Sequence, residues 1–109
     1  MRYKVDTIAP FRKEAKKLIK KYPSLKQELA DLGTRLSIDP AIGIALGNDC
    51  YKIRLAIASK GKGKAGGARV ITHFYVVEDT VFLLSIYDKS AKDTIPNHYI
   101  KVLLSFIQD

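Results

Sequence analysis

The sequence predicts an α+β domain of order β-α-α-β-β-β-α, with a small, mainly antiparallel sheet, an N-terminal helical hairpin and a C-terminal helix. Two observations predict it. Apolar residues recur at helical spacing in two successive N-terminal segments and again at the C-terminus, whereas they alternate between residues 50 and 87, as in strands. At 109 residues, 47% of them hydrophobic, the chain is long enough for one packed core. We therefore expect a single domain over residues 1–109 and one functional site.

The N-terminal segment predicts one strand followed by two helices. Residues 2–6 alternate as in a half-buried strand. Pro10 suits the first turn of a helix, Pro23 ends that helix, and Ser24 with Gln27 has the spacing of a capping box for a second one. Each helix has an apolar stripe at helical spacing, formed by Phe11, Ala15, Leu18, Ile19 and Tyr22 in the first and by Leu25, Leu29, Leu32 and Leu36 in the second.

The middle of the chain predicts a loop and then a basic strand. Residues 41–49 mix glycine with small and apolar residues, so we expect a loop there. From Cys50 onward the alternation is clear, and it places Lys52 and Arg54 on the same side of a strand. Residues 59–67 are too rich in glycine to pack and too basic for an ordinary tight turn, which predicts an exposed loop.

Two apolar segments and a final helix complete the predicted fold. Residues 68–78 read as a long central strand with apolar side chains on both faces, and residues 81–87 as its hairpin partner. The last helix is expected to begin near Thr94, with Pro96 inside its first turn. Its apolar stripe is formed by Tyr99, Ile100, Leu103, Leu104 and Ile107.

The chain is strongly basic, with a net charge of +8 and a pI near 9.6. Six basic residues and no acidic one lie between Lys52 and Arg69, so this stretch predicts a positive site for a polyanion. Nucleic acid, an acidic protein or an anionic membrane surface would each fit the excess charge. The single Cys50 forms no internal disulfide, and neither a membrane-length apolar run nor a signal sequence is visible, so we expect a cytoplasmic protein.

Four segments between Tyr51 and Lys92 are distinctive: the basic strand KIRLA, the loop KGKGKAGG, the strand start GARVI and the strand end LLSIYDKS. Together with the order of elements, they resemble the RelE/ParE superfamily of toxins from bacterial toxin-antitoxin systems, most closely its RelE and HigB branches. The resemblance runs over nearly the whole chain. It implies a RelE-like toxin domain that cleaves mRNA in the ribosomal A site and inhibits translation.

The same resemblance implies the partners. A cognate antitoxin of the RelB or HigA kind, acidic or partly disordered, is expected to neutralise the toxin. The ribosome and its mRNA are the expected targets, and operator DNA is expected to be reached only through the antitoxin. No cofactor, metal or membrane is expected. The two histidines and one cysteine are far apart in sequence and lack the spacing of a metal site.

Alternation predicts that basic and polar side chains of three strands share one face if those strands are neighbours. Metal-free RNA cleavage needs a base for the ribose 2'-OH, cations for the charged phosphorane and an acid for the departing 5'-oxygen. The sequence offers many cations but no evident acid-base pair. The residues predicted to share the face are Lys52, Arg54, Arg69, Ile71, His73, Ser85, Tyr87 and Lys89.

Carried over by motif, the resemblance implies a role for each basic residue. Lys52 is the expected base, Arg69 and Lys89 the phosphate stabilisers, and Arg54 the residue that holds the RNA backbone. Ile95 stands where RelE-type enzymes place a stacking tyrosine, which leaves Tyr87 or Tyr99 for that role. The residues expected to contact RNA or the ribosome without reacting are Arg54, Lys60, Lys62, Lys64 and His73.

Each assignment has a structural alternative. Arg69 could pair with Asp88 or Glu78, Lys52 could be a solvated strand residue, and His73 could be a hydrogen-bonded core histidine. The basic face of the first helix is likewise either a solvated surface or a second phosphate contact. Two further functions remain open, a ParE-like poison of DNA gyrase and a non-catalytic RNA-binding module.

Overall fold

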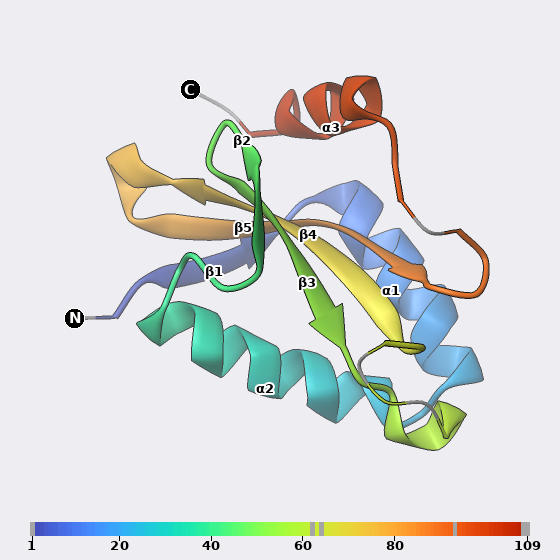
Figure 1. Cartoon of the computed structure of the whole chain (residues 1–109). Helices are drawn as coiled ribbons and strands as arrows, with labels where there is room; N and C mark the ends of the chain where they lie inside the picture. The colour runs from blue at the N-terminus through green and yellow to red at the C-terminus, as the bar shows by residue number, and fades with distance from the viewer. Residues whose placement is uncertain (1, 62, 64, 93, 108–109) are drawn as a thin grey trace.

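A computed structural model of the chain describes residues 2–61, 63, 65–92 and 94–107 (Figure 1). Within this part, a five-stranded sheet packs against two N-terminal helices and a C-terminal helix, which confirms the predicted α+β fold. The elements are β1 (Lys4–Thr7), α1 (Ala9–Lys21), α2 (Leu25–Ile38), β2 (Ile44–Gly47), β3 (Cys50–Leu55), η1 (Ala58–Lys60), β4 (Ala68–Tyr75), η2 (Val76–Glu78), β5 (Thr80–Asp88) and α3 (Asn97–Leu104). Among the described residues, no helix combines the length and apolar content needed to cross a bilayer.

Four local predictions were wrong. Strand β2 lies inside the expected loop at residues 41–49, and β4 ends at Tyr75 because residues 76–78 form the short helix η2. Helix α3 begins at Asn97, after Pro96, rather than near Thr94. No capping box forms at Ser24, whose side chain contacts Glu28 and the hydroxyl of Ser59 instead.

The sheet has the strand order β1-β5-β4-β3-β2. Only β1 and β5 run parallel, and the other neighbouring pairs are antiparallel. Strands β3, β4 and β5 are therefore consecutive neighbours, as the prediction of a shared face requires. Their register places Arg54 opposite Arg69 and Arg69 opposite Tyr87, with Lys52, Ile71 and Ser85 in the parallel row one step along.

Leucines of α2 and apolar residues of β3, β4 and β5 build the core. Leu25, Leu32 and Leu36 are fully buried, as the predicted stripe requires, and Leu29 packs against the core at its margin.

Helix α1 packs along β5 beyond the four residues that pair with β1. There the Glu14 carboxylate accepts hydrogen bonds from the Ser85 hydroxyl at 2.9 Å and from the Ile86 N–H at 3.3 Å. Helix α1 thus satisfies backbone that β1 leaves unpaired.

Candidate nucleic-acid interface

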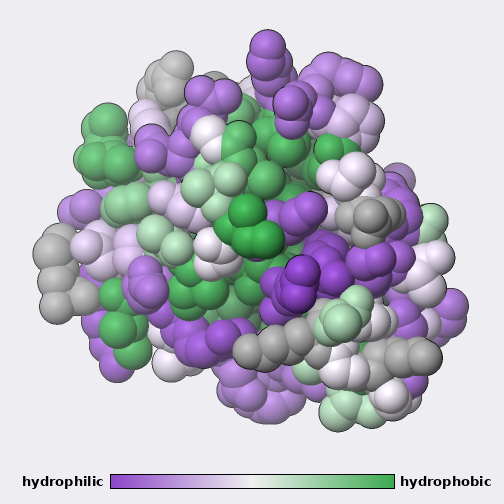
Figure 2. Space-filling model, viewed as in Figure 1, coloured by the Kyte–Doolittle hydropathy of each residue, from purple (hydrophilic) through white to green (hydrophobic). Residues whose placement is uncertain are grey.

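One face of the sheet gathers the predicted basic residues. Arg54 and Arg69 are cross-strand neighbours, and Lys52, two residues before Arg54 on the same strand, lies on the same side. Hydrophilic side chains are concentrated over the ends of β3 and β4 on the face turned to the viewer, beside apolar patches toward β2 and α3 (Figure 2). The structure therefore brings together the cations of β3 and β4, although their surroundings differ.

Arg69 is a buried residue, with 5% of its surface exposed. Its guanidinium donates hydrogen bonds to the carbonyl oxygens of Ala65 at 3.0 Å and Ala68 at 3.1 Å. These bonds fix the end of the loop at residues 59–67 against β4. Arg69 is therefore a rigid cation beside the face rather than a mobile side chain on it.

Tyr87, the neighbour of Arg69 on β5, is also buried, with 4% exposure. The Lys92 ammonium lies 5.7 Å from the centre of its ring, in the range of a cation-π contact. A base can stack on the Tyr87 ring only if the covering side chains move. Lys89 is half-buried at the start of the segment that follows β5, where its N–H donates to the Gly67 carbonyl at 3.0 Å.

Lys60 forms an ion pair with Asp88. The Lys60 ammonium also donates to the Gly66 carbonyl at 3.0 Å, and the Asp88 carboxylate accepts from Tyr22 and from the Ser90 backbone and hydroxyl. Burial by itself raises the pKa of Asp88, but the hydrogen bonds from Lys60, Ser90 and Tyr22 outweigh it and hold the pKa below its usual value. Lys60 is thus occupied by protein oxygens. Lys62 and Lys64 lie outside the described residues.

Lys52 and Arg54 line an open hollow beside β3, with a volume of about 470 Å³. We call it the β3-edge hollow, and its other lining residues are Arg35, Ile42, Gly43, Ile44 and Ile53. The side chains of Arg35, Lys52 and Arg54 make no hydrogen bond or ion pair with any residue that the structure describes. These three cations are therefore available to an external anion.

His73 lies away from this hollow, toward α3. Its Nδ1 is 3.6 Å from the thiol sulfur of Cys50, and it lines a shallow cleft with Asn48, Tyr75, Leu104 and Ile107. Burial lowers the pKa of His73 and raises the pKa of Cys50 to about 11. A neutral imidazole and a protonated thiol at neutral pH give a packed pair, and the described residues offer no third metal ligand beside them.

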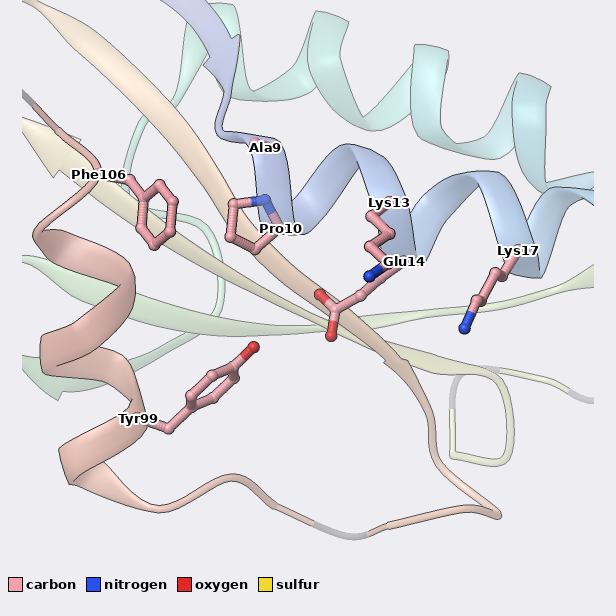
Figure 3. Close-up of a pocket in the computed structure, with 7 residues that line it drawn as sticks. All are labelled: Ala9, Pro10, Lys13, Glu14, Lys17, Tyr99 and Phe106. Carbon is pink, nitrogen blue, oxygen red and sulfur yellow. The ribbon is translucent and has the colours of Figure 1, made fainter.

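Tyr99 lies in a different place, in a cleft of about 480 Å³ between α1 and α3 (Figure 3). Its hydroxyl points toward the Glu14 carboxylate across that cleft. Burial raises the pKa of Tyr99, and the charge of Glu14 adds to the effect. Burial likewise raises the pKa of Glu14, against the hydrogen bonds from Ser85 and Ile86. Tyr99 does not lie with the cations of β3 and β4. Ile95, at the position of the family's tyrosine, is buried.

Sequence reasoning missed Arg35. It lies in the last turn of α2, where a basic residue is ordinarily explained by the helix dipole. Only the path of residues 39–43 brings it beside β3. The one signal in the sequence is the Asp39-Pro40 exit with Gly43 close behind, which indicates a tight return of the chain but not its direction.

The fold was compared with known proteins. No family model matches the chain. The free-state structure of an Escherichia coli RelE toxin variant is similar at a TM-score of 0.65, with 21% sequence identity over 98% of this chain and 100% of that one. The chain has the RelE-like toxin fold.

Two further structures agree with the RelE-like assignment. The isolated E. coli RelE toxin has a TM-score of 0.60 and 19% identity, over 96% of this chain and 99% of that one. The E. coli RelBE toxin-antitoxin complex has a TM-score of 0.59 and 24% identity, over 79% of this chain and 95% of the matched one. At these identities, the RelE-like likeness establishes the fold and leaves the chemistry to be argued from the site.

Proposed function

We propose that this protein is the toxin of a type II toxin-antitoxin system and that it cleaves mRNA in the ribosomal A site. The observation that carries the proposal is the pair of unpartnered cations, Lys52 and Arg54, on the sheet face beside the fixed Arg69 of a RelE-like fold, within the part of the chain that the structure describes. A polyanionic strand laid across this face would meet charges that the protein itself does not neutralise.

The proposed reaction transfers the phosphoryl group within the RNA. The ribose 2'-oxygen attacks the adjacent phosphorus as its proton passes to the base. The bond to the 5'-oxygen then breaks as that oxygen takes a proton from a general acid, which leaves a 2',3'-cyclic phosphate and a 5'-hydroxyl. Lys52 is the proposed base, because it is half-buried at the face and has no partner among the described residues.

The roles of the other site residues are assigned from where each one lies in the structure. Arg69 and Lys89 are proposed to stabilise the charged phosphorane, and Arg54 to hold the backbone of the RNA. Arg69 suits its role because two backbone carbonyls fix its guanidinium, so little reorganisation is needed when charge develops. Tyr87 is proposed to stack on a base once Lys92 moves off its ring. Lys62, Lys64 and His73 remain proposed ribosome contacts, whereas the ion pair of Lys60 favours a structural role.

The proposed partner is an acidic antitoxin that is partly disordered when free. The net charge of +8 supports an acidic partner, and the matched RelBE complex is a toxin bound to an antitoxin. A disordered segment that folds on binding can cover a large part of a small domain. The proposal requires a tight complex between this protein and the product of the adjacent reading frame. Co-purification of the two proteins tests whether that complex forms.

The decisive experiment maps 5' ends on translated and untranslated copies of one transcript after expression in a bacterial host. Wild type is expected to cut only the translated copy, in register with its codons. Lys52→Ala and Arg54→Ala are expected to reduce cutting by about 100-fold and about 10-fold, as losses of an acid-base group and of one charged contact. Lys26→Ala, which removes an exposed charge from α2, is the matched control.

Growth arrest with intact transcripts would overturn the nuclease proposal and favour a protein target such as gyrase. Unchanged cutting by Lys52→Ala and Arg54→Ala, with the variants folded, would place the chemistry elsewhere. Loss of RNA binding in these variants without any cleavage by wild type would favour a non-catalytic RNA-binding module.

A further inference from the structure

The β3-edge hollow extends the cationic face around the edge of the sheet toward α2. Strand β2 pairs with β3 only at Cys50, Tyr51 and Lys52, so β3 continues beyond its neighbour. Arg54 lies on that uncovered part of β3, and Arg35 reaches the same space from the last turn of α2. The hollow therefore joins two elements that are separate in sequence.

The loop before β2 lies close against β3 at Gly43, which lines the hollow. Gly43 has a φ of +105°, and a Cβ placed on it would lie 2.5 Å from the Lys52 carbonyl oxygen and 2.9 Å from Ile53 Cγ1. Only glycine allows this close approach of the loop to β3. At the other end of the turn, the Asp39 carboxylate accepts the Ala41 N–H at 3.1 Å, which places that acidic side chain in the turn.

Charge favours an anionic occupant. Arg35, Lys52 and Arg54 line one hollow, no acidic residue lines it, and none of the three has a protein partner within the described chain. Three like charges around one space repel one another until an anion enters. Two further lining residues, Ile42 and Ile44, are apolar, and Ile44 is 54% exposed. A ligand with alternating phosphate and apolar surface matches both features.

We propose that the β3-edge hollow binds the backbone of single-stranded RNA next to the nucleotide that lies on Lys52, and that Arg35 is the residue that fixes this part of the strand. The inference rests on the proposed function for one point, which is that the RNA strand reaches the hollow from a nucleotide bound at Lys52. Arg54 lies beside Arg69 on the sheet and also lines the hollow. An RNA strand that crosses Arg69 and Arg54 therefore continues toward Arg35 along an unbroken series of cations. Ile44 supplies apolar surface for a sugar or a base.

The test measures binding of the purified protein to a 2'-O-methyl oligoribonucleotide by fluorescence anisotropy across a series of salt concentrations. The methyl groups block the 2'-oxygens, so binding is measured without cleavage. Arg35→Ala is expected to weaken binding about five-fold and to lower the salt slope by about 0.7, the loss of one phosphate contact on a single strand. Arg35→Lys is expected to restore most of the salt slope, because it restores the charge.

Lys26→Ala is the matched control. It removes one positive charge from the same helix, but Lys26 lines the cleft between α1 and α2 and not the β3-edge hollow. Equal binding by Arg35→Ala and Lys26→Ala would overturn the proposal, as would the absence of wild-type binding at low salt. Weaker binding of the antitoxin by Arg35→Ala, with unchanged RNA affinity, would also overturn it and assign the hollow to an acidic peptide.

Failure of this inference is distinguishable from failure of the proposed function. Codon-registered cleavage by wild type with no effect of Arg35→Ala on RNA binding leaves the nuclease proposal intact and removes only the role of the hollow. The reverse result, an Arg35-dependent affinity for RNA without cleavage of translated mRNA, keeps the hollow and removes the nuclease.

Discussion

The two ends of the cationic face differ in what neutralises their charges. At the end next to the loop at residues 59–67, which we call the loop end, Lys60 is paired with Asp88, and Arg69 donates to two backbone carbonyls. At the β3 edge, Lys52 and Arg54 have no partner within the described chain. Cations that are neighbours in the sequence motif therefore divide into a group held in place by protein oxygens and a group without a partner among the described residues.

This division changes what a mutation at each cation measures. Removing Lys60 leaves a buried carboxylate without its charge partner, which costs stability before it affects any ligand. Removing Lys52 uncovers no buried charge, because no acidic side chain contacts it in the described structure. Loss of the proposed cleavage by itself therefore does not identify a catalytic residue next to the loop at residues 59–67.

The same substitution at the two lysines gives the largest expected contrast. Lys60→Met is expected to lower the free energy of unfolding by about 3 kcal/mol, because it breaks an ion pair whose two side chains are 11% and 8% exposed. Lys52→Met is expected to change it by less than about 0.5 kcal/mol. Urea unfolding of both variants measures the difference.

RNA affinity is expected to show the opposite order. Lys52→Met should weaken binding to the 2'-O-methyl oligoribonucleotide, and Lys60→Met should leave it unchanged under conditions where it is folded. Similar losses of stability in both variants would contradict the division of the face into two groups.

Substitutions of two glycines, Gly43 and Gly33, test the backbone at the β3 edge. Gly43→Ala is expected to cost about 2 kcal/mol of unfolding free energy, because φ of +105° strains any other residue and the new Cβ meets β3. Gly33→Ala is the control within α2. No described atom lies within 4 Å of its new Cβ, so the gain in helix propensity should stabilise the protein by up to about 1 kcal/mol.

Binding distinguishes an effect on the hollow from an effect on stability alone. Folded Gly43→Ala should bind the 2'-O-methyl oligoribonucleotide as weakly as Arg35→Ala, because the new Cβ displaces the loop from β3 and so changes the lining of the hollow. Wild-type affinity in folded Gly43→Ala would show that the loop conformation has no part in binding.

Much of the sheet was predictable from alternation. Arg54, Arg69 and Tyr87 fall in one row because side chains on alternate residues share a face, and the three strands are indeed neighbours. Strand β2 was missed for a physical reason. Its residues are all exposed, so pairing with β3 and not burial defines it, and its glycine gave the appearance of a loop.

The state of each site residue could not be predicted in the same way. Lys60 and Asp88 are 28 residues apart, and only the packing of η1 against the end of β5 brings them together. Arg35 required the turn after α2 to be known. Alternation thus predicts which side chains share a face, whereas tertiary contacts decide which of their charges remain available.

The Lys60–Asp88 ion pair should be visible in acid unfolding, through the direction in which the free energy of unfolding changes with pH. The pKa of Asp88 is held below its usual value in the folded protein, so its stabilisation is complete above the unfolded value of about 3.9 and is lost as the pH falls through and below that value. The advantage of wild type over Asp88→Asn should shrink by about 1 kcal/mol between about pH 6 and about pH 3. Urea midpoints measured across this range test it.

Glu14 supplies the matched comparison, because burial raises the pKa of its carboxyl instead. The folded protein then binds a proton at Glu14 more readily than the unfolded chain, so this residue becomes more favourable as the pH falls. The difference between wild type and Glu14→Gln should therefore move in the opposite direction to that for Asp88→Asn. Parallel changes in the two variants would mean that overall charge repulsion, and not the Lys60–Asp88 pair, governs acid stability at the loop end of the face.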